Sequence, residues 1–152
     1  MNAFLIDTTT PGLARRCAAL VYDGLLLAAL WLAAGALMLV LSGGWLAESG
    51  RPLWLVYALR ASLVLVTGLF FGGFWTHGGQ TLGMRAWRLQ LVNSADAGPV
   101  SWKQALLRLA AACLSAAALG IGFFWVLIDR ERRSWHDHLS GTHLVLLPAK
   151  KT

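Results

Sequence analysis

Three charged residues, Asp23, Arg60 and Arg108, lie inside otherwise apolar stretches of the sequence. A charge near the centre of a bilayer costs about 2.5–3.5 kcal/mol even on lenient insertion scales. Each charged side chain therefore needs an oppositely charged partner, contact with water, or a conformation that reaches the membrane surface. A carboxylate in such a place can bind a cation or shuttle a proton, with an affinity set by competition with an arginine. These residue types therefore predict ion coupling if the stretches cross a membrane, or fixation of helix register if they only pair.

Spacing from the ends of the apolar stretches predicts which of these charges meet. Asp23 lies seven residues beyond Arg16, or about 10 Å of helix, and Arg108 lies seven residues beyond Ser101. If both helices enter from the same side, Asp23 and Arg108 lie at a similar depth. We therefore expect an ion pair between them inside the bundle.

Arg60 enters its stretch from the opposite side, seven residues beyond Leu53. This places it about 10 Å from Asp23 along the membrane normal. At that distance Arg60 needs bridging water, or it extends its side chain toward the outer headgroups. Arg60 is therefore a secondary, structural candidate.

The composition indicates that lipid surrounds the elements that carry these charges. Hydrophobic residues make up 57% of the 152 positions and charged residues 13%, against about 25% charged in a soluble domain. Three apolar stretches, at about 15–41, 53–76 and 104–128, each reach the length of about 20 residues that a membrane-spanning helix needs. The sequence predicts one all-α membrane domain over residues 1–152, with a tail at 129–152.

The basic residues conflict with three simple crossings. Cytoplasmic loops are enriched in Lys and Arg, and the connection Ser42–Pro52 carries only Arg51, offset by Glu48. The N-terminal segment, the second connection and the tail are all basic, through Arg15, Arg16, Arg85, Arg88, Lys103, Arg130, Arg132, Arg133, Lys150 and Lys151. The N-terminus and the tail are therefore both expected in the cytoplasm, yet three crossings would separate them.

The third stretch offers a way out of this conflict. Glycines at positions 120 and 122 predict that it is broken or re-entrant there, since glycine costs about 1 kcal/mol in a helix interior; the alternative is a straight helix whose glycines aid packing. Arg85–Val92 and His143–Leu147 resemble short strands. If they pair into a short cytoplasmic β-ribbon, both must lie on one side of the membrane.

Other kinds of chemistry find little support. We expect no enzyme and no cofactor, because no nucleophile elbow, phosphate loop, paired catalytic carboxylates or HExxH motif occurs. His136, His138 and His143 lack the tight spacing of zinc sites, so we expect no metal, and Asp137 is expected to organise a turn. The basic surface favours anionic lipid headgroups over nucleic acid.

Three motifs occur in order along most of the chain: RRCAALVYD from Arg15 to Asp23, GQTLGMR from Gly79 to Arg85, and RSWHD from Arg133 to Asp137, followed by Gly141-Thr142. Their order and spacing resemble the RDD family of bacterial membrane proteins. The resemblance implies a multi-pass protein of the inner (plasma) membrane. It also implies a role in transport, with cation/proton exchange suggested for some relatives.

The family is named for one arginine and two aspartates, and this resemblance assigns candidate residues. Arg16 and Asp23 match the first two by their spacing, and Asp137 matches the third, with Asp129 as the alternative. Arg108 lies where relatives often carry arginine. Met84 departs from the lysine that commonly follows Thr-Leu-Gly.

Two functions remain open. One is a transport component that uses Asp23 with Arg16, Arg108 and Asp137. Three apolar segments are too few to surround a conduction path, so this function requires a homo-oligomer or a larger membrane complex. The other is a non-catalytic membrane subunit that assembles with or stabilises a partner complex.

Overall fold

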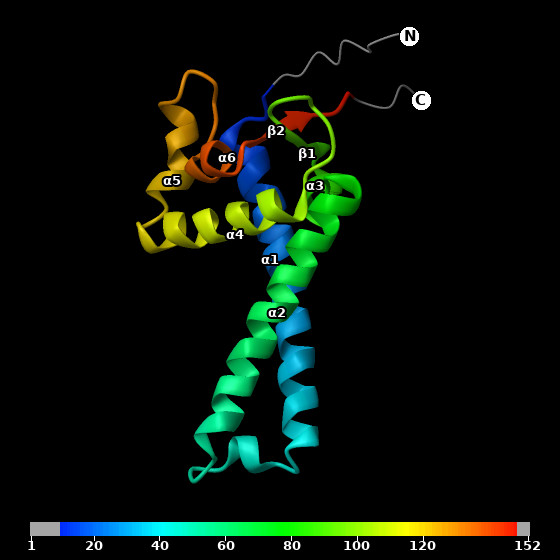
Figure 1. The fold of residues 1–152 in the computed structure, drawn as a ribbon, viewed down its shortest axis with the longest axis vertical. Helices are drawn as coiled ribbons and strands as arrows, with labels where there is room; N and C mark the ends of the chain where they lie inside the picture. Colours follow the sequence, from blue (N-terminus) through cyan, green and yellow to red (C-terminus); the bar gives the residue numbers. More distant parts are fainter. Residues whose placement is uncertain (1–9, 149–152) are drawn as a thin grey trace.

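The computed structural model describes residues 10–148. Two long helices, α1 (Leu13–Leu41) and α2 (Leu53–Gly78), run alongside each other, and η1 (Trp45–Ala47) lies in the connection at their open end (Figure 1). The remaining elements gather at the other end, and we call them the cap. In chain order the cap contains α3 (Leu82–Ala86), β1 (Leu89–Asn93), α4 (Trp102–Ala117), α5 (Ile121–Phe124), η2 (Trp125–Leu127), α6 (Trp135–Ser140) and β2 (Thr142–Leu146).

The helices α1 and α2 are each long and apolar enough to cross a membrane. Their 29 and 26 residues correspond to about 43 and 39 Å of helix, against about 30 Å for a hydrocarbon core. Both helices are therefore longer than the core is thick. One interhelical hydrogen bond joins them, from Trp31 Nε1 to Thr67 Oγ1 at 3.0 Å.

The third apolar stretch is broken, as predicted. It forms α4, then bends by 109° into Ile121–Leu127. Leu119 and Gly120 have φ values of 55° and 80°, which end the helix because this backbone region does not continue an α-helix. The alternative of a straight helix is wrong. α4 crosses the end of the α1–α2 pair instead of running along it (Figure 1).

The predicted β-ribbon is confirmed, with a shorter first strand. β1 and β2 pair antiparallel, with Leu91 opposite Leu144. The expected strand at Arg85–Val92 begins only at Leu89, because residues 82–86 form α3 and Arg88 adopts a φ of 58°. Thr81 starts α3 by accepting a hydrogen bond from the Met84 N–H at 3.2 Å.

A small core holds the cap against the two long helices. It contains apolar residues from α1, α2, α3, β1, α4 and β2, together with Val100: Ala19, Trp75, Met84, Leu89, Leu91, Val100, Ala105 and Leu144. The start of α1 and the end of β2 lie together at this end (Figure 1). Three straight crossings would have separated the basic N-terminal segment from the basic tail. Because α4 lies across the long helices and the chain then bends, the start of α1 and the segment that follows α4 lie at the same end of the molecule.

Candidate functional site

A buried carboxylate joins three parts of the cap. Asp137 Oδ2 accepts a hydrogen bond from Arg16 Nη1 at 2.9 Å, and Asp137 Oδ1 accepts one from Arg108 Nη1 at 2.6 Å. The Ser134 N–H also donates to Oδ2, at 2.9 Å. This last bond has the capping-box spacing, which fixes Asp137 in the first turn of α6. We call Arg16, Arg108 and Asp137 the ion triad.

Both arginines of the triad make further contacts that fix their side chains. Arg108 is 4% exposed, lies 5.4 Å from the ring of Trp75, and donates to Thr142 Oγ1 at 2.8 Å. Arg16 donates to the carbonyl oxygens of Pro11 and Arg132 at 3.2 and 2.9 Å. The triad thus ties the start of α1 to α4, α6 and β2.

Two groups of α6 have shifted pKa values. Burial opposes ionisation of Asp137, but Arg108 and Arg16 outweigh it and hold the pKa of that carboxyl well below its usual range. Burial first, and then the charge of Arg108, lower the pKa of His136 to about 3. The His136 ring packs against Phe123 with centroids 4.9 Å apart. At neutral pH the region therefore contains two arginines, one carboxylate and a neutral histidine.

Asp23 lies in a different environment, which we call the Asp23 corner. Thr81 Oγ1 donates to Asp23 Oδ2, and the Gly83 N–H donates to Oδ1 at 2.8 Å. Gly83 is required here, because a Cβ at that position would lie 2.4 Å from the Ala19 carbonyl oxygen. Asp23 is 3% exposed, and within residues 10–148 no Lys, Arg or His nitrogen lies within 4.0 Å of its carboxylate.

The predicted Asp23–Arg108 ion pair is wrong. The prediction measured depth for both residues as though their helices ran parallel, but α4 lies across the others (Figure 1). Arg108 pairs with Asp137 instead. Asp23 lies about 15 Å along α1 from Leu13, in the half of the helix nearer the cap.

The secondary candidates lie outside both networks. Arg60 is exposed on α2, with its guanidinium 6.0 Å from the ring of Tyr57. Asp129 accepts a hydrogen bond from the Arg133 N–H at 2.8 Å and lies 3.4 Å from His138 Nε2. Asp129 therefore organises the turn before α6 and does not contact the two arginines of the triad. Among residues 10–148, no group of three or more His, Cys, Asp or Glu side chains is placed to hold a metal ion.

Sequence reasoning missed the partners of these charges. Thr81 and Gly83 bind Asp23, and Ser134 and Thr142 complete the triad. The Ser134-x-x-Asp137 spacing is itself a helix-start signal that could have fixed the position of Asp137. Nothing in the spacing of Thr81 and Asp23, 58 residues apart, indicates that they meet.

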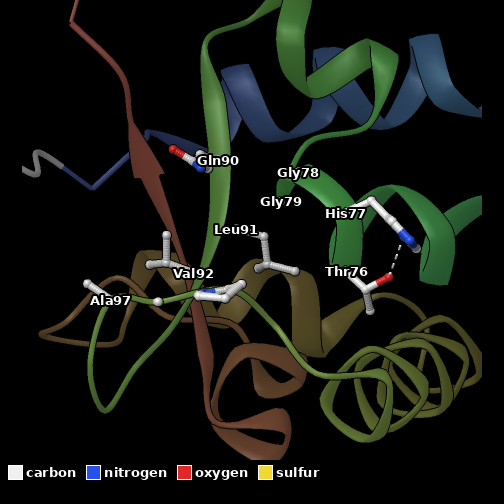
Figure 2. Close-up of a pocket in the computed structure, with 10 residues that line it drawn as sticks. Thr76, His77, Gly78, Gly79, Gln90, Leu91, Val92 and Ala97 are labelled. Atoms are coloured by element: carbon white, nitrogen blue, oxygen red, sulfur yellow. Dashed lines mark hydrogen bonds between the residues drawn. The ribbon is translucent and has the colours of Figure 1, made fainter.

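Two cavities lie near the end of α2, and neither is lined by a residue of the triad. A hollow of about 290 Å³ lies between the last turn of α2 and β1 with the loop that follows it, and Figure 2 shows Thr76 and His77 on one side and Leu91, Val92 and Ala97 on the other. His77 is the one titratable residue that lines it. Neither Asp23 nor Asp137 lines this hollow.

Comparison with known proteins gives a family but no mechanism. The chain is 27% identical over 85 residues to the uncharacterized protein RP437 of Rickettsia prowazekii. The aligned region covers 56% of this chain and 47% of that protein. The chain thus matches less than half of that relative. No solved structure matches. The family model described as RDD family matches residues 10–141, a range that includes Arg16, Asp23 and Asp137. Because this match covers most of the sequence, the protein belongs to the RDD family and is a membrane protein with apolar helices.

Proposed function

We propose that the protein is a non-enzymatic transport component that exchanges a proton or a monovalent cation at Asp23. The observation that carries the proposal is the Asp23 corner, where a buried carboxylate meets neutral donors only. An isolated buried charge is costly, so such a carboxylate favours a bound proton or cation. Asp137 does not have this property, because two arginines already neutralise it.

The ion triad supports this function indirectly. It fixes the cap on α1, and the cap carries Thr81 and Gly83, the two donors that reach Asp23. Arg16 and Asp23 lie on the same helix, seven residues apart. The triad is therefore the framework of the site, and Arg16, Arg108 and Asp137 are positioning residues.

We place the cap in the cytoplasm, at the inner membrane. Exposed or half-buried basic residues gather at the cap end, including Arg15, Arg85, Lys103 and Arg130, whereas the connection at the open end has only Arg51. This distribution follows the enrichment of Lys and Arg in cytoplasmic segments. Anionic headgroups would neutralise these basic residues.

A second function, a non-catalytic subunit of a larger membrane complex, is favoured by the exposure of the long helices. In the most apolar 18-residue segment of each long helix, only 6% of the residues are buried against the rest of the chain. These faces are free for lipid, for a second copy or for partner helices. Transport also needs such an assembly, since two long helices do not enclose a path.

The deciding experiment is ion flux in liposomes that contain the purified protein and a pH-sensitive dye. We expect an imposed Na⁺ or K⁺ gradient to drive proton movement with wild type. Asp23→Asn should abolish it, because the amide keeps the shape but neither ionises nor binds a cation well. Asp96→Asn, the same change on an exposed loop residue, is the matched control and should keep wild-type flux.

Two results would count against the transport proposal. Wild-type flux in Asp23→Asn would remove Asp23 from the mechanism. No flux in wild type, together with one membrane protein that co-purifies reproducibly from native membranes, would favour the subunit function.

A further inference from the structure

A groove on the outer side of α2 lies beside the Asp23 corner but belongs to neither network. Its volume is about 350 Å³. It combines apolar, glycine and basic residues from the last turns of α2 and from α3: Leu69, Gly73, Phe74, His77, Gly78 and Arg85. The groove therefore has an apolar part toward the middle of α2 and a basic part toward the cap.

The position of the groove matches the border between hydrocarbon and headgroups. A core of about 30 Å takes up about 20 residues of helix, so α2 measured from Leu53 leaves the core near Gly73. Leu69 then lies within the acyl-chain region. His77 and Arg85 lie at the depth of the phosphate groups, where long basic side chains bind anionic lipid.

The glycines shape the groove. A Cβ at Gly73 would meet no atom within 4 Å, so the space beside the helix is open there. At Gly78 a Cβ would lie 3.9 Å from Arg85 Nη2, which places the guanidinium over the basic end of the groove. The adjacent hollow shown in Figure 2 shares His77 and Gly78 with the groove.

We propose that this groove binds one anionic phospholipid. An acyl chain lies along Leu69, Gly73 and Phe74, and the phosphate is held by Arg85, beside the His77 ring whose Nδ1 donates to the Gly73 carbonyl oxygen at 3.0 Å. Charge complementarity selects an anionic headgroup, and the apolar part selects a lipid over a free phosphate. The site is separate from the ion exchange proposed for Asp23.

The test uses the full-length protein in detergent and native mass spectrometry, with phosphatidylglycerol and phosphatidylcholine of identical acyl chains. We expect wild type to retain one phosphatidylglycerol at concentrations roughly tenfold lower than phosphatidylcholine, because the choline cation of phosphatidylcholine offsets the phosphate charge and is repelled by Arg85. Arg85→Gln should abolish this preference. Arg130→Gln removes the same charge from another exposed arginine of the cap end and should keep it.

A steric pair of variants tests the apolar part without changing any charge. Gly73→Leu should fill the groove and weaken retention of both lipids about tenfold. Gly68→Leu, on the same helix but outside the groove and also in open space, should have no effect. Glycerol 3-phosphate, which has no acyl chain, should not compete.

Three outcomes would overturn the proposal. Equal retention of the two lipids by wild type would remove headgroup selection. An unchanged preference in Arg85→Gln would place the headgroup elsewhere on the cap. Full competition by glycerol 3-phosphate would make the site a free-phosphate site. Thermal melting of each variant in detergent checks that the fold is retained.

Discussion

The ion triad and the Asp23 corner solve the same problem in two ways. Each buries an aspartate at the cap end of α1, at 0% and 3% exposure for Asp137 and Asp23. Asp137 lies between two arginine side chains, whereas Asp23 takes one hydroxyl and one backbone N–H. In the triad two arginines outweigh the single carboxylate, so the charge of Asp137 is fully compensated. The corner satisfies hydrogen bonds but leaves its charge uncompensated.

Under the proposed function, this difference separates a structural acid, Asp137, from an acid that exchanges an ion, Asp23. Removing the charge of Asp137 leaves two buried cations without a counter-charge, which is costly. Removing the charge of Asp23 leaves only hydrogen bonds to rearrange. Stability should therefore depend mainly on Asp137, and ion flux should depend directly on Asp23.

The largest expected effect is that of Asp137→Asn. It should lower the free energy of unfolding by about 3–5 kcal/mol, because Arg16 and Arg108 lose their shared partner. The measurement is denaturant unfolding in mixed micelles followed by tryptophan fluorescence. Glu131→Gln, which removes an exposed partner of Arg133, should cost less than about 1 kcal/mol. Equal losses in the two variants would contradict the structural role of the triad.

Gly83→Ala tests the Asp23 corner by geometry. The added Cβ would lie 2.4 Å from the Ala19 carbonyl oxygen and 2.9 Å from the Asp23 carboxylate. Separating α3 from α1 should cost up to about 3 kcal/mol, the upper end for an overpacked site. Gly24→Ala, where a Cβ meets nothing within 4 Å, should not destabilise the protein. A Gly83→Ala variant as stable as Gly24→Ala would show that this contact is not maintained.

The free energy of unfolding should depend on pH through the titration of His136, which lies next to the triad. Its pKa falls from 6.5 to about 3 on folding, so the unfolded chain binds a proton that the folded chain does not, and stability falls as pH drops below 6.5. Between pH 7 and 5 the loss should be about 2 kcal/mol. The lowered pKa of Asp137 contributes stability that is lost only as pH falls below 3.8, outside this window.

His136→Phe keeps a ring against Phe123 and removes this titration, so the unfolding free energy should fall less between pH 7 and 5 than in wild type. Part of the fall remains, because burial also lowers the pKa of His143. His138→Phe changes an exposed histidine of the same helix and should keep the wild-type slope. Parallel slopes in wild type and His136→Phe would show that another group titrates.

The smallest expected effect on stability is that of Asp23→Asn. The amide oxygen can keep one of the two hydrogen bonds, so the cost should be about 1 kcal/mol. The same unfolding measurement as for Asp137→Asn makes the comparison direct. A loss as large as that of Asp137→Asn would mean that the carboxylate of Asp23 is ionised and structural, like that of Asp137.

Local signals in the sequence predicted the elements well. Length and apolarity identified α1 and α2, and glycine at position 120 identified the break after α4. Alternation predicted the first of the paired strands, and a short apolar run predicted the second. These features depend on neighbours along the chain. The helix α3, which takes up the first two residues of Arg85–Val92, was missed. The hydrogen bond from the Met84 N–H to Thr81 and the contact of Gly83 with α1 override the strand pattern there.

The site was predicted only in part, because its pairings depend on orientation. The residues Arg16, Asp23, Arg108 and Asp137 are all buried or half-buried at the cap. Which acid meets which arginine depends on α4 lying across the other helices, and no periodicity in the sequence encodes that crossing. A depth count from the ends of the helices therefore paired the wrong partners.

The long separation within the triad also has a consequence for how the chain matures. Arg16 and Asp137 are 121 residues apart, so the first arginine of the triad leaves the ribosome long before its carboxylate does. Until Asp137 arrives, Arg16 and Arg108 have no shared acid, and the cap cannot close over α1. Completion of the cap therefore waits for the synthesis of α6, and a nascent chain that stops before α6 would leave Arg16 and Arg108 without their shared carboxylate.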